Sequence, residues 1–181
     1  MNCSILLING SLRSGSVNAA VLATAQSIKP ENVVTRLYEG TANLPHFNPD
    51  DDTEPLNPFV RALRADVNQA DAILLCTPEY AGALPGSFKN LLDWTVGGTE
   101  ISGKPVGWIN AASSAAPAGG EDAYASLRRV LGYVGARMVE EACIRIPVSR
   151  KDVDPEGLLQ DPLMRQGIAS ALSSLAAAET E

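Results

Sequence analysis

The sequence predicts an α/β fold, a three-layer sandwich in which helices cover both faces of a five-stranded parallel sheet. Short apolar runs alternate along the chain with longer segments of helical periodicity, which is typical of βαβ units. The first, third and fourth of these runs end in loops of small residues rich in glycine, serine or proline. We expect the doubly wound strand order 2-1-3-4-5, in which these three strands are neighbours.

Five apolar segments are predicted as strands. Ala72–Cys76 is wholly apolar, as expected of a central strand covered on both faces. The last segment carries Glu140, Glu141 and Arg145 among apolar residues, which indicates a position nearer the edge of the sheet. The five segments are residues 5–8, 33–37, 72–76, 104–110 and 138–146.

Apolar residues in the intervening segments recur every three or four positions, the spacing of a helix packed on one side. The predicted stripes are Val17, Ala20, Val21, Ala25 and Ile28; Val60, Leu63 and Val67; Phe88, Leu91, Leu92 and Val96; Tyr124, Leu127, Leu131 and Val134; and Ile168, Leu172 and Leu175. Residues 38–58 form the longest irregular stretch and contain His46, the only histidine, which we expect to be a loop residue.

Composition predicts one domain over residues 1–181, because 181 residues, 45% of them hydrophobic, suffice for one full core and are few for two. A net charge of -7 without a basic run argues against a nucleic-acid partner. No signal peptide and no run of about 18 apolar residues is present, so we expect a cytoplasmic protein without a membrane partner. Cys3, Cys76 and Cys143 are expected to be reduced thiols, and no metal site is expected.

The loop after the first strand, Gly10-Ser-Leu-Arg-Ser-Gly-Ser-Val-Asn18, carries the signal of an anion site. A strand that leads through small residues into a helix gathers backbone N–H groups and the positive end of the helix dipole. Arg13 adds a permanent charge suited to phosphate oxygens, and Ser11, Ser16 and Asn18 add short donors. The same residues also fit a capped turn with Ser16 as the N-cap, so alone they leave both interpretations open.

Two other phosphate loops do not match this segment. Gly10 and Gly15 have the spacing of a P-loop, but Ser16 and Val17 stand where Lys and Ser or Thr are required. A G-x-G-x-x-G dinucleotide motif is also missing after this strand. The loop therefore favours a monophosphate over a diphosphate.

Two further loops are expected at the same edge, because ligands of open parallel sheets bind outside the carboxyl ends of the strands. Residues 77–86 contain two prolines and two glycines, and Tyr80 offers an aromatic surface to a planar ring. A rigid turn with Tyr80 as packing is the simpler alternative. Residues 111–120 form a third loop of small residues. The three loops together predict a binding crevice that holds a phosphate on one side and a ring on the other.

About residues 2–146 resemble the NADPH-dependent FMN reductases, a family of flavodoxin-like proteins that includes flavin, quinone, azo-dye and chromate reductases. The resemblance rests on two motifs that occur in the right order and context, and on the spacing of the third loop before its helix. The segments are Gly10-Ser-Leu-Arg13 with Ser16 and Asn18; Pro78-Glu-Tyr-Ala-Gly82 continuing through Pro85-Gly86 and Lys89-Asn90 to Asp93-Trp94; and Ser113 to Gly120.

The resemblance implies an oxidoreductase that moves hydride from NADPH or NADH to FMN, and then two electrons to a small acceptor such as a quinone, free flavin, azo dye or metal oxyanion. The flavin carries the chemistry of such enzymes, so no side chain is singled out as catalytic. The implied cofactor contacts are Ser11, Arg13, Ser16 and Asn18 for the phosphate; Pro78, Glu79, Tyr80, Ala81 and Gly82 for the isoalloxazine; and Ser113 for the ribityl and pyrimidine side.

The resemblance also implies a homodimer or homotetramer, with Trp94 either at the interface or in the core. The family commonly has Asn after the Glu-Tyr pair and Ser after the next glycine, where this chain has Ala81 and Ala83. Backbone N–H groups are expected to replace the lost side-chain donors. An FMN-binding electron carrier or a sensor domain without reductase activity is the alternative, although flavodoxins typically use a Thr-rich loop without an arginine like Arg13.

Overall fold

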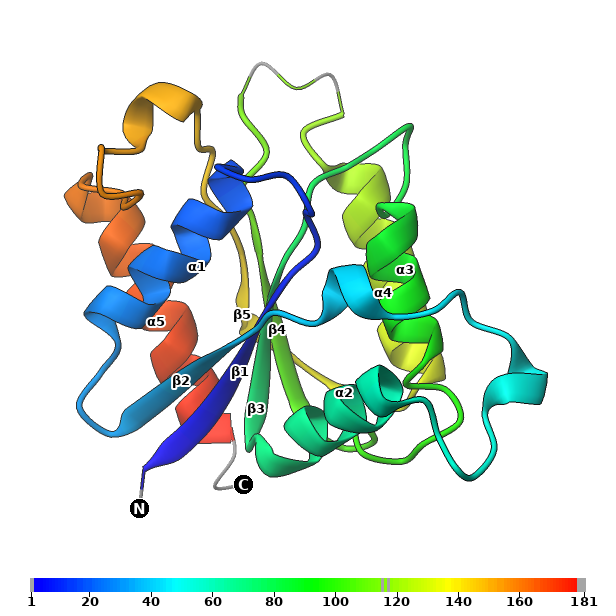
Figure 1. Ribbon diagram of the computed structural model, residues 1–181. Helices are drawn as coiled ribbons and strands as arrows, with labels where there is room; N and C mark the ends of the chain where they lie inside the picture. Colours follow the sequence, from blue (N-terminus) through cyan, green and yellow to red (C-terminus); the bar gives the residue numbers. More distant parts are fainter. Residues whose placement is uncertain (1, 115, 117, 179–181) are drawn as a thin grey trace.

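The computed structural model describes residues 2–114, 116 and 118–178. Its core is a five-stranded parallel sheet in the order β2-β1-β3-β4-β5 (Figure 1). The strands are β1 (Cys3–Asn9), β2 (Val33–Tyr38), β3 (Ala72–Cys76), β4 (Pro105–Asn110) and β5 (Arg137–Arg145). The predicted fold class and strand order are confirmed, and each observed strand lies within two residues of its predicted bounds.

Helices cover both faces of the sheet, with α1 and α5 on one side and α2, α3 and α4 on the other (Figure 1). They are α1 (Val17–Ile28), α2 (Pro58–Gln69), α3 (Gly86–Asp93), α4 (Glu121–Tyr133) and α5 (Pro162–Ala178). Three short 3-10 helices lie in the loops: η1 (Thr41–Asn43), η2 (Pro49–Asp51) and η3 (Arg150–Asp152).

The sheet separates two apolar cores, and alternation along the strands supplies both. Ile5 and Leu7 of β1 pack with α1 and α5, whereas Leu6 and Ile8 pack with α2, α3 and α4. Every residue of β3 is buried, as predicted for a central strand. Full burial of each large aliphatic side chain contributes about 1.5–3 kcal/mol to folding, so these two cores fix the positions of the strand ends.

The carboxyl ends of the strands meet at one level. The parallel register pairs Asn9 with Cys76 and Cys76 with Ile109, so the loops after β1, β3 and β4 begin side by side. The backbone N–H of Ile146 donates to the carbonyl of Asn110 over 2.8 Å. This bond extends the sheet beyond β5 and brings a fourth loop to the same edge.

Helix α3 is shorter than predicted. The N–H groups of Thr95 and Val96 donate to carbonyls three residues back, at Leu92 and Asp93, so the chain leaves the α-helix in a tighter turn. Val96, predicted on the apolar face of this helix, therefore lies beyond its end and is 59% exposed. Val134 is the C-cap of α4; its N–H still donates to the carbonyl of Val130, and it packs against the apolar core with the predicted face of this helix.

The long irregular segment between β2 and α2 is tied to α3 and its C-cap by polar contacts. The indole Nε1 of Trp94 and the amide of Asn90 both donate to the carbonyl of Pro45, over 2.8 and 2.9 Å. Asn90 Oδ1 also accepts from the N–H of Phe47 at 2.7 Å. Trp94 is fully buried and belongs to the core, whereas His46 is an exposed loop residue. Asn90 and Trp94 thus hold a loop in place.

Asp50, Asp51 and Asp52 form an acidic run in this segment, and its last residue packs against α2. Asp52 and Arg64 form an ion pair of 2.8 Å that is largely shielded from solvent, and the Arg64 guanidinium also donates to the carbonyl of Trp94. Asp50 and Asp51 are exposed. Asp50 and Asp51 therefore face solvent, while Asp52 helps to hold the loop.

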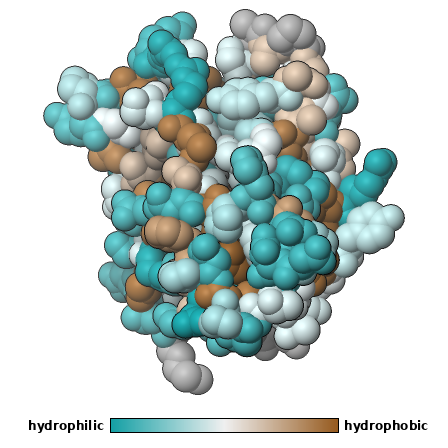
Figure 2. Space-filling model, turned by 45° about the vertical axis from the view of Figure 1, so that its right-hand side comes forward, coloured by the Kyte–Doolittle hydropathy of each residue, from teal (hydrophilic) through white to brown (hydrophobic). Residues whose placement is uncertain are grey.

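No helix in the described ranges is long and apolar enough to cross a bilayer. Figure 2 shows a face that is largely hydrophilic, with apolar side chains in small patches. Of the three cysteines, Cys3 and Cys76 are buried and Cys143 is half-buried.

Gly10 is required where β1 approaches β3, and this requirement is testable. A Cβ at Gly10 would lie 2.5 Å from the Cβ of Thr77, still closer to its hydroxyl oxygen, and 3.1 Å from Phe88. Gly10→Ala should therefore lower the free energy of unfolding by about 1–3 kcal/mol in urea titrations. The matched control is Gly132→Ala in α4, where an added Cβ would meet open space. This change should raise the free energy of unfolding by about 0.5–1 kcal/mol, because alanine has the higher helix propensity. Equal effects of the two changes would contradict the close approach.

Candidate functional site

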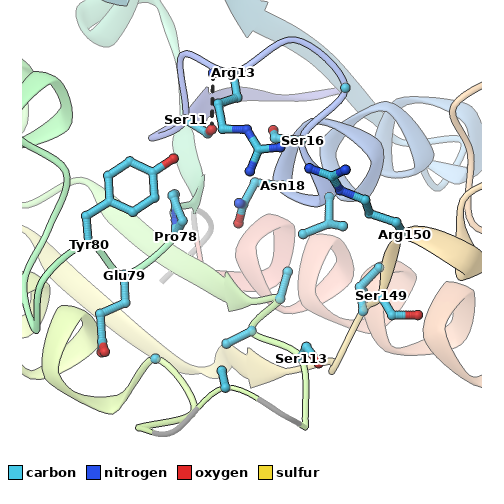
Figure 3. A pocket seen from close by; sticks show the side chains of 17 residues that line it. Ser11, Arg13, Ser16, Asn18, Pro78, Glu79, Tyr80, Ser113, Ser149 and Arg150 are labelled. Atoms are coloured by element: carbon cyan, nitrogen blue, oxygen red, sulfur yellow. Dashed lines mark hydrogen bonds between the residues drawn. The ribbon is translucent and has the colours of Figure 1, made fainter.

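A cavity of about 420 Å³ opens at the carboxyl edge of the sheet, between the loops that follow β1, β3, β4 and β5 (Figure 3). Its volume lies in the usual range for small-molecule and cofactor sites. The cavity brings together most of the residues singled out from the sequence, namely Ser11, Arg13, Ser16, Asn18, Pro78, Glu79, Tyr80 and Ser113. Ala81 and Gly82 are not among its lining residues.

The β1–α1 loop presents short polar groups at the N-terminus of α1. Asn9 Oδ1 accepts from the N–H of Ser11 at 2.9 Å, and Ser11 Oγ accepts from the N–H of Arg13 at 3.3 Å. Ser16 is the N-cap, with its Oγ accepting from the N–H of Ala19 at 3.1 Å. Ser16 therefore caps the helix and also lines the cavity, where its hydroxyl hydrogen can still be donated.

Asn18 is buried and oriented by the neighbouring strand. The Cys76 thiol donates to Asn18 Oδ1 over 3.2 Å. Burial raises the pKa of the Cys76 thiol, so the thiol stays protonated and remains a donor. Because the amide oxygen is engaged in this way, the amide N–H₂ of Asn18 is left to donate to a ligand in the cavity.

The β3–α3 loop forms a two-residue hairpin at the mouth of the cavity. Tyr80 and Ala83 exchange backbone hydrogen bonds of 3.0 and 3.1 Å, and φ is positive at both central residues, +52° at Ala81 and +70° at Gly82. Positive φ at both positions is the pattern of a type I′ turn, for which Asn-Gly is the favoured pair. The N–H of Ala83 donates within the turn and is not available to a ligand. This N–H therefore does not replace the side-chain donors that the family commonly has at positions 81 and 83.

Tyr80 lies on the opposite side of the cavity from Arg150, and its side chain is partly exposed (Figure 3). Glu79, expected to line the isoalloxazine, is a cavity-lining residue and also has a structural partner. Its carboxylate accepts from the N–H of Ala123 at 3.1 Å, in the first turn of α4, and points away from Arg13 and Ser16. The N-cap of this helix, Gly120, has no side chain to offer, so Glu79 provides the cap and joins two cavity walls.

The β4–α4 loop is closed by a buried asparagine. Asn110 Oδ1 accepts from the N–H of Ala112 at 2.9 Å, the same turn that Asn9 makes after β1, and its Nδ2 donates to the carbonyl of Gly119 at 2.8 Å. Ser113 lines the cavity from this loop. Ala115 and Pro117 of the predicted small-residue segment lie outside the described residues.

Sequence reasoning missed the contribution of the β5–α5 loop. Val148, Ser149 and Arg150 line the cavity, although no residue beyond Ser113 was expected to contribute to the site. The available signal was topological, because this loop also follows the carboxyl end of a parallel strand. Its composition gave no hint, since it lacks the glycine and serine pattern of the other loops.

Fold and site together define a mononucleotide-binding α/β protein. On one side, hydroxyl and amide donors and Arg13 surround the N-terminus of α1, a combination suited to a phosphate. On the other side, Pro78 and Tyr80 form a wall suited to a planar ring.

The chain belongs to the NADPH-dependent FMN reductase family, whose model matches residues 3–148. It is 32% identical over 173 residues to an NAD(P)H-dependent FMN reductase of Pseudomonas aeruginosa, covering 94% of this chain and 92% of that protein. It is 31% identical over 155 residues to a quinone reductase of Escherichia coli, covering 84% and 81%. The flavoenzyme FerB, an NAD(P)H:(acceptor) oxidoreductase of Paracoccus denitrificans, has a TM-score of 0.84 and 25% identity, with coverage of 98% and 97%.

The hairpin at Ala81 yields a stability prediction. Ala81 is the one non-glycine residue with positive φ in the described ranges, and asparagine tolerates this conformation better than alanine does. Ala81→Asn should raise the free energy of unfolding by about 0.5–1 kcal/mol, measured by urea denaturation. Ala83→Ser, the other departure from the family pattern, should leave stability unchanged. A loss of stability in Ala81→Asn would argue against the turn geometry.

Proposed function

We propose that this protein is an NAD(P)H-dependent, FMN-containing oxidoreductase that delivers two electrons to a small acceptor such as a quinone. One observation carries the proposal: a donor-rich helix N-terminus with Arg13 and a wall formed by Pro78 and Tyr80 lie in one cavity. The first suits the phosphate of FMN and the second its ring. Membership of the family supports the reductase over the alternative of a carrier or sensor.

The residues present fit FMN by the chemistry of their donors. Ser11, Ser16 and Asn18 are buried polar side chains at the helix end, and a phosphate can accept from all of them together with backbone N–H groups. Arg13 is exposed and forms no ion pair within the described ranges, so its guanidinium is available to the phosphate oxygens.

FMN, when bound, accepts hydride from a nicotinamide and passes two electrons to the acceptor. The protein binds the cofactor and orients it. Arg13 and the α1 terminus fix the phosphate end, Pro78 and Tyr80 position the ring, and the Glu79 cap holds the β3–α3 loop against α4. His46 is not among the cavity-lining residues, consistent with chemistry that requires no histidine base.

The acceptor, assembly and compartment are further parts of the proposal. A quinone is supported by the quinone reductase among the relatives and by the exposed apolar surfaces of Leu12 and Tyr80, which belong to the loops that line the cavity.

The family resemblance supports a homodimer or homotetramer. Use of NAD(P)H and the free thiols of Cys76 and Cys143 fit the cytoplasm. The length supports one domain over residues 1–181.

Arg13→Ala should weaken FMN binding by roughly 1.5–3 kcal/mol, because the charged contact to the phosphate is lost. Fluorescence titration of the flavin-stripped protein with FMN measures the change. Arg129→Ala removes an exposed arginine of α4 outside the cavity and serves as the control, with unchanged affinity. An unchanged FMN affinity in Arg13→Ala would mean that the β1–α1 loop is only a capped turn and not a phosphate site.

Steady-state kinetics test the reaction itself. With one cavity serving both nicotinamide and acceptor, we expect ping-pong behaviour, seen as parallel double-reciprocal lines when NADPH or NADH is varied at several quinone concentrations. Under anaerobic conditions, the nicotinamide alone should bleach the flavin absorbance before any quinone is added. Absence of nicotinamide oxidation with FMN and quinone present would refute the reductase.

A further inference from the structure

A second arginine reaches the phosphate side of the cavity. Arg150 belongs to η3 on the β5–α5 loop, opposite the β1–α1 loop that carries Arg13, and both residues line the main cavity together with Ser16. Figure 3 shows the guanidinium groups of Arg13 and Arg150 on the same side of the cavity as Ser16. Both arginines also line an adjoining hollow of about 360 Å³. Two loops that are distant in sequence thus present positive charge at the same helix end.

Neither Arg13 nor Arg150 forms an ion pair with a carboxylate among the described residues. The ion pairs formed there involve Arg36, Arg61, Arg64, Lys89 and Arg128, and neither cavity arginine. The chain has 21 acidic residues against 14 basic ones, so carboxylates are not scarce. Two unpaired guanidinium groups beside the positive end of the α1 dipole repel one another, and a bound dianion removes that repulsion.

The backbone that carries Arg150 is held in place. Asp152 Oδ2 accepts from the N–H and the hydroxyl of Ser149, over 2.8 and 2.6 Å, and this capping box shapes the turn. The N–H of Val148 donates to the carbonyl of Ala111, and the Val148 side chain is buried. The nearest carboxylate along the chain, Asp152, is therefore occupied by Ser149, and the turn fixes where the arginine emerges.

We propose that Arg150 is a second phosphate-binding residue, which pairs with Arg13 to match the two charges of the FMN phosphate and makes the site selective for FMN over riboflavin. The proposal rests on the proposed function. A phosphate monoester carries about -1.5 to -2 charges at neutral pH, which one arginine balances only in part. Arg150 also lies beyond residues 3–148, the segment matched by the family, so the family match does not account for it.

The test compares two ligands that differ only in the phosphate. The full-length, flavin-stripped protein is titrated with FMN and with riboflavin as wild type, Arg150→Ala, Arg150→Lys and Lys151→Ala. We expect Arg150→Ala to weaken FMN binding about tenfold and riboflavin binding less than about twofold, because the lost contact is charge-assisted. Arg150→Lys should retain part of the FMN affinity. Lys151→Ala, which removes the adjacent cation that lines neither hollow, should change neither affinity.

Salt dependence gives a second readout. FMN affinity of the wild type should fall as ionic strength rises, and the fall should be shallower in Arg150→Ala because one screened charge pair is gone. Urea denaturation of each variant verifies that the protein remains folded, and Arg150→Gln replaces the alanine variant if that one does not.

Several results would overturn the proposal. Equal weakening of FMN and riboflavin would place Arg150 at the ring or in a structural role. Unchanged FMN affinity, or an effect confined to the KM for NADPH, would show that Arg150 does not contact the phosphate. If Arg13→Ala weakens FMN while Arg150→Ala does not, the proposed function stands and this inference fails. A wild-type protein that binds no FMN would refute both.

Discussion

The parallel pairing of β1, β3 and β4 is the constraint on which the site depends. Backbone register places Asn9 beside Cys76 and Cys76 beside Ile109, so three chain segments leave the sheet at one level. The two apolar cores hold these strands, and Ala111 and Val148 of the cavity wall belong to one of them. Loops that begin from a fixed edge can then carry polar side chains at little cost to stability.

The loops themselves are shaped by a small set of local devices. Asn9 and Asn110 end their strands with the same side-chain-to-backbone turn, and Ser16 and Glu79 cap the helices that follow two of the loops. Each device satisfies a backbone N–H that would otherwise be orphaned near the cavity. Some of the residues expected to contact the cofactor therefore also shape the loops, and Glu79 is the clearest case.

The sequence predicted the sheet, its order and the β1–α1 loop because those features follow from apolar periodicity and from the local chemistry of turns. It did not predict Arg150. A single arginine in a polar segment can be recognised as a site residue only when the position of β5 shows that it lines the same cavity as Arg13. The end of α3 before Val96 was misassigned, and the capping contact of Glu79 was not predicted, for a related reason, since a helix end and a cap depend on partners in space. The cofactor contacts at Ala81, Gly82 and the other site residues stay predictions, as does the single domain over 1–181.

The thiol of Cys76 has a consequence for any chemical study of the protein. It is fully buried beneath Asn18, and its burial keeps it protonated. Alkylating and oxidising reagents attack thiolates that solvent can reach, and this sulfur is neither charged nor accessible in the folded chain. Modification of Cys76 thus reports opening of the sheet beneath the cavity, which makes this residue an internal gauge of whether the site is intact.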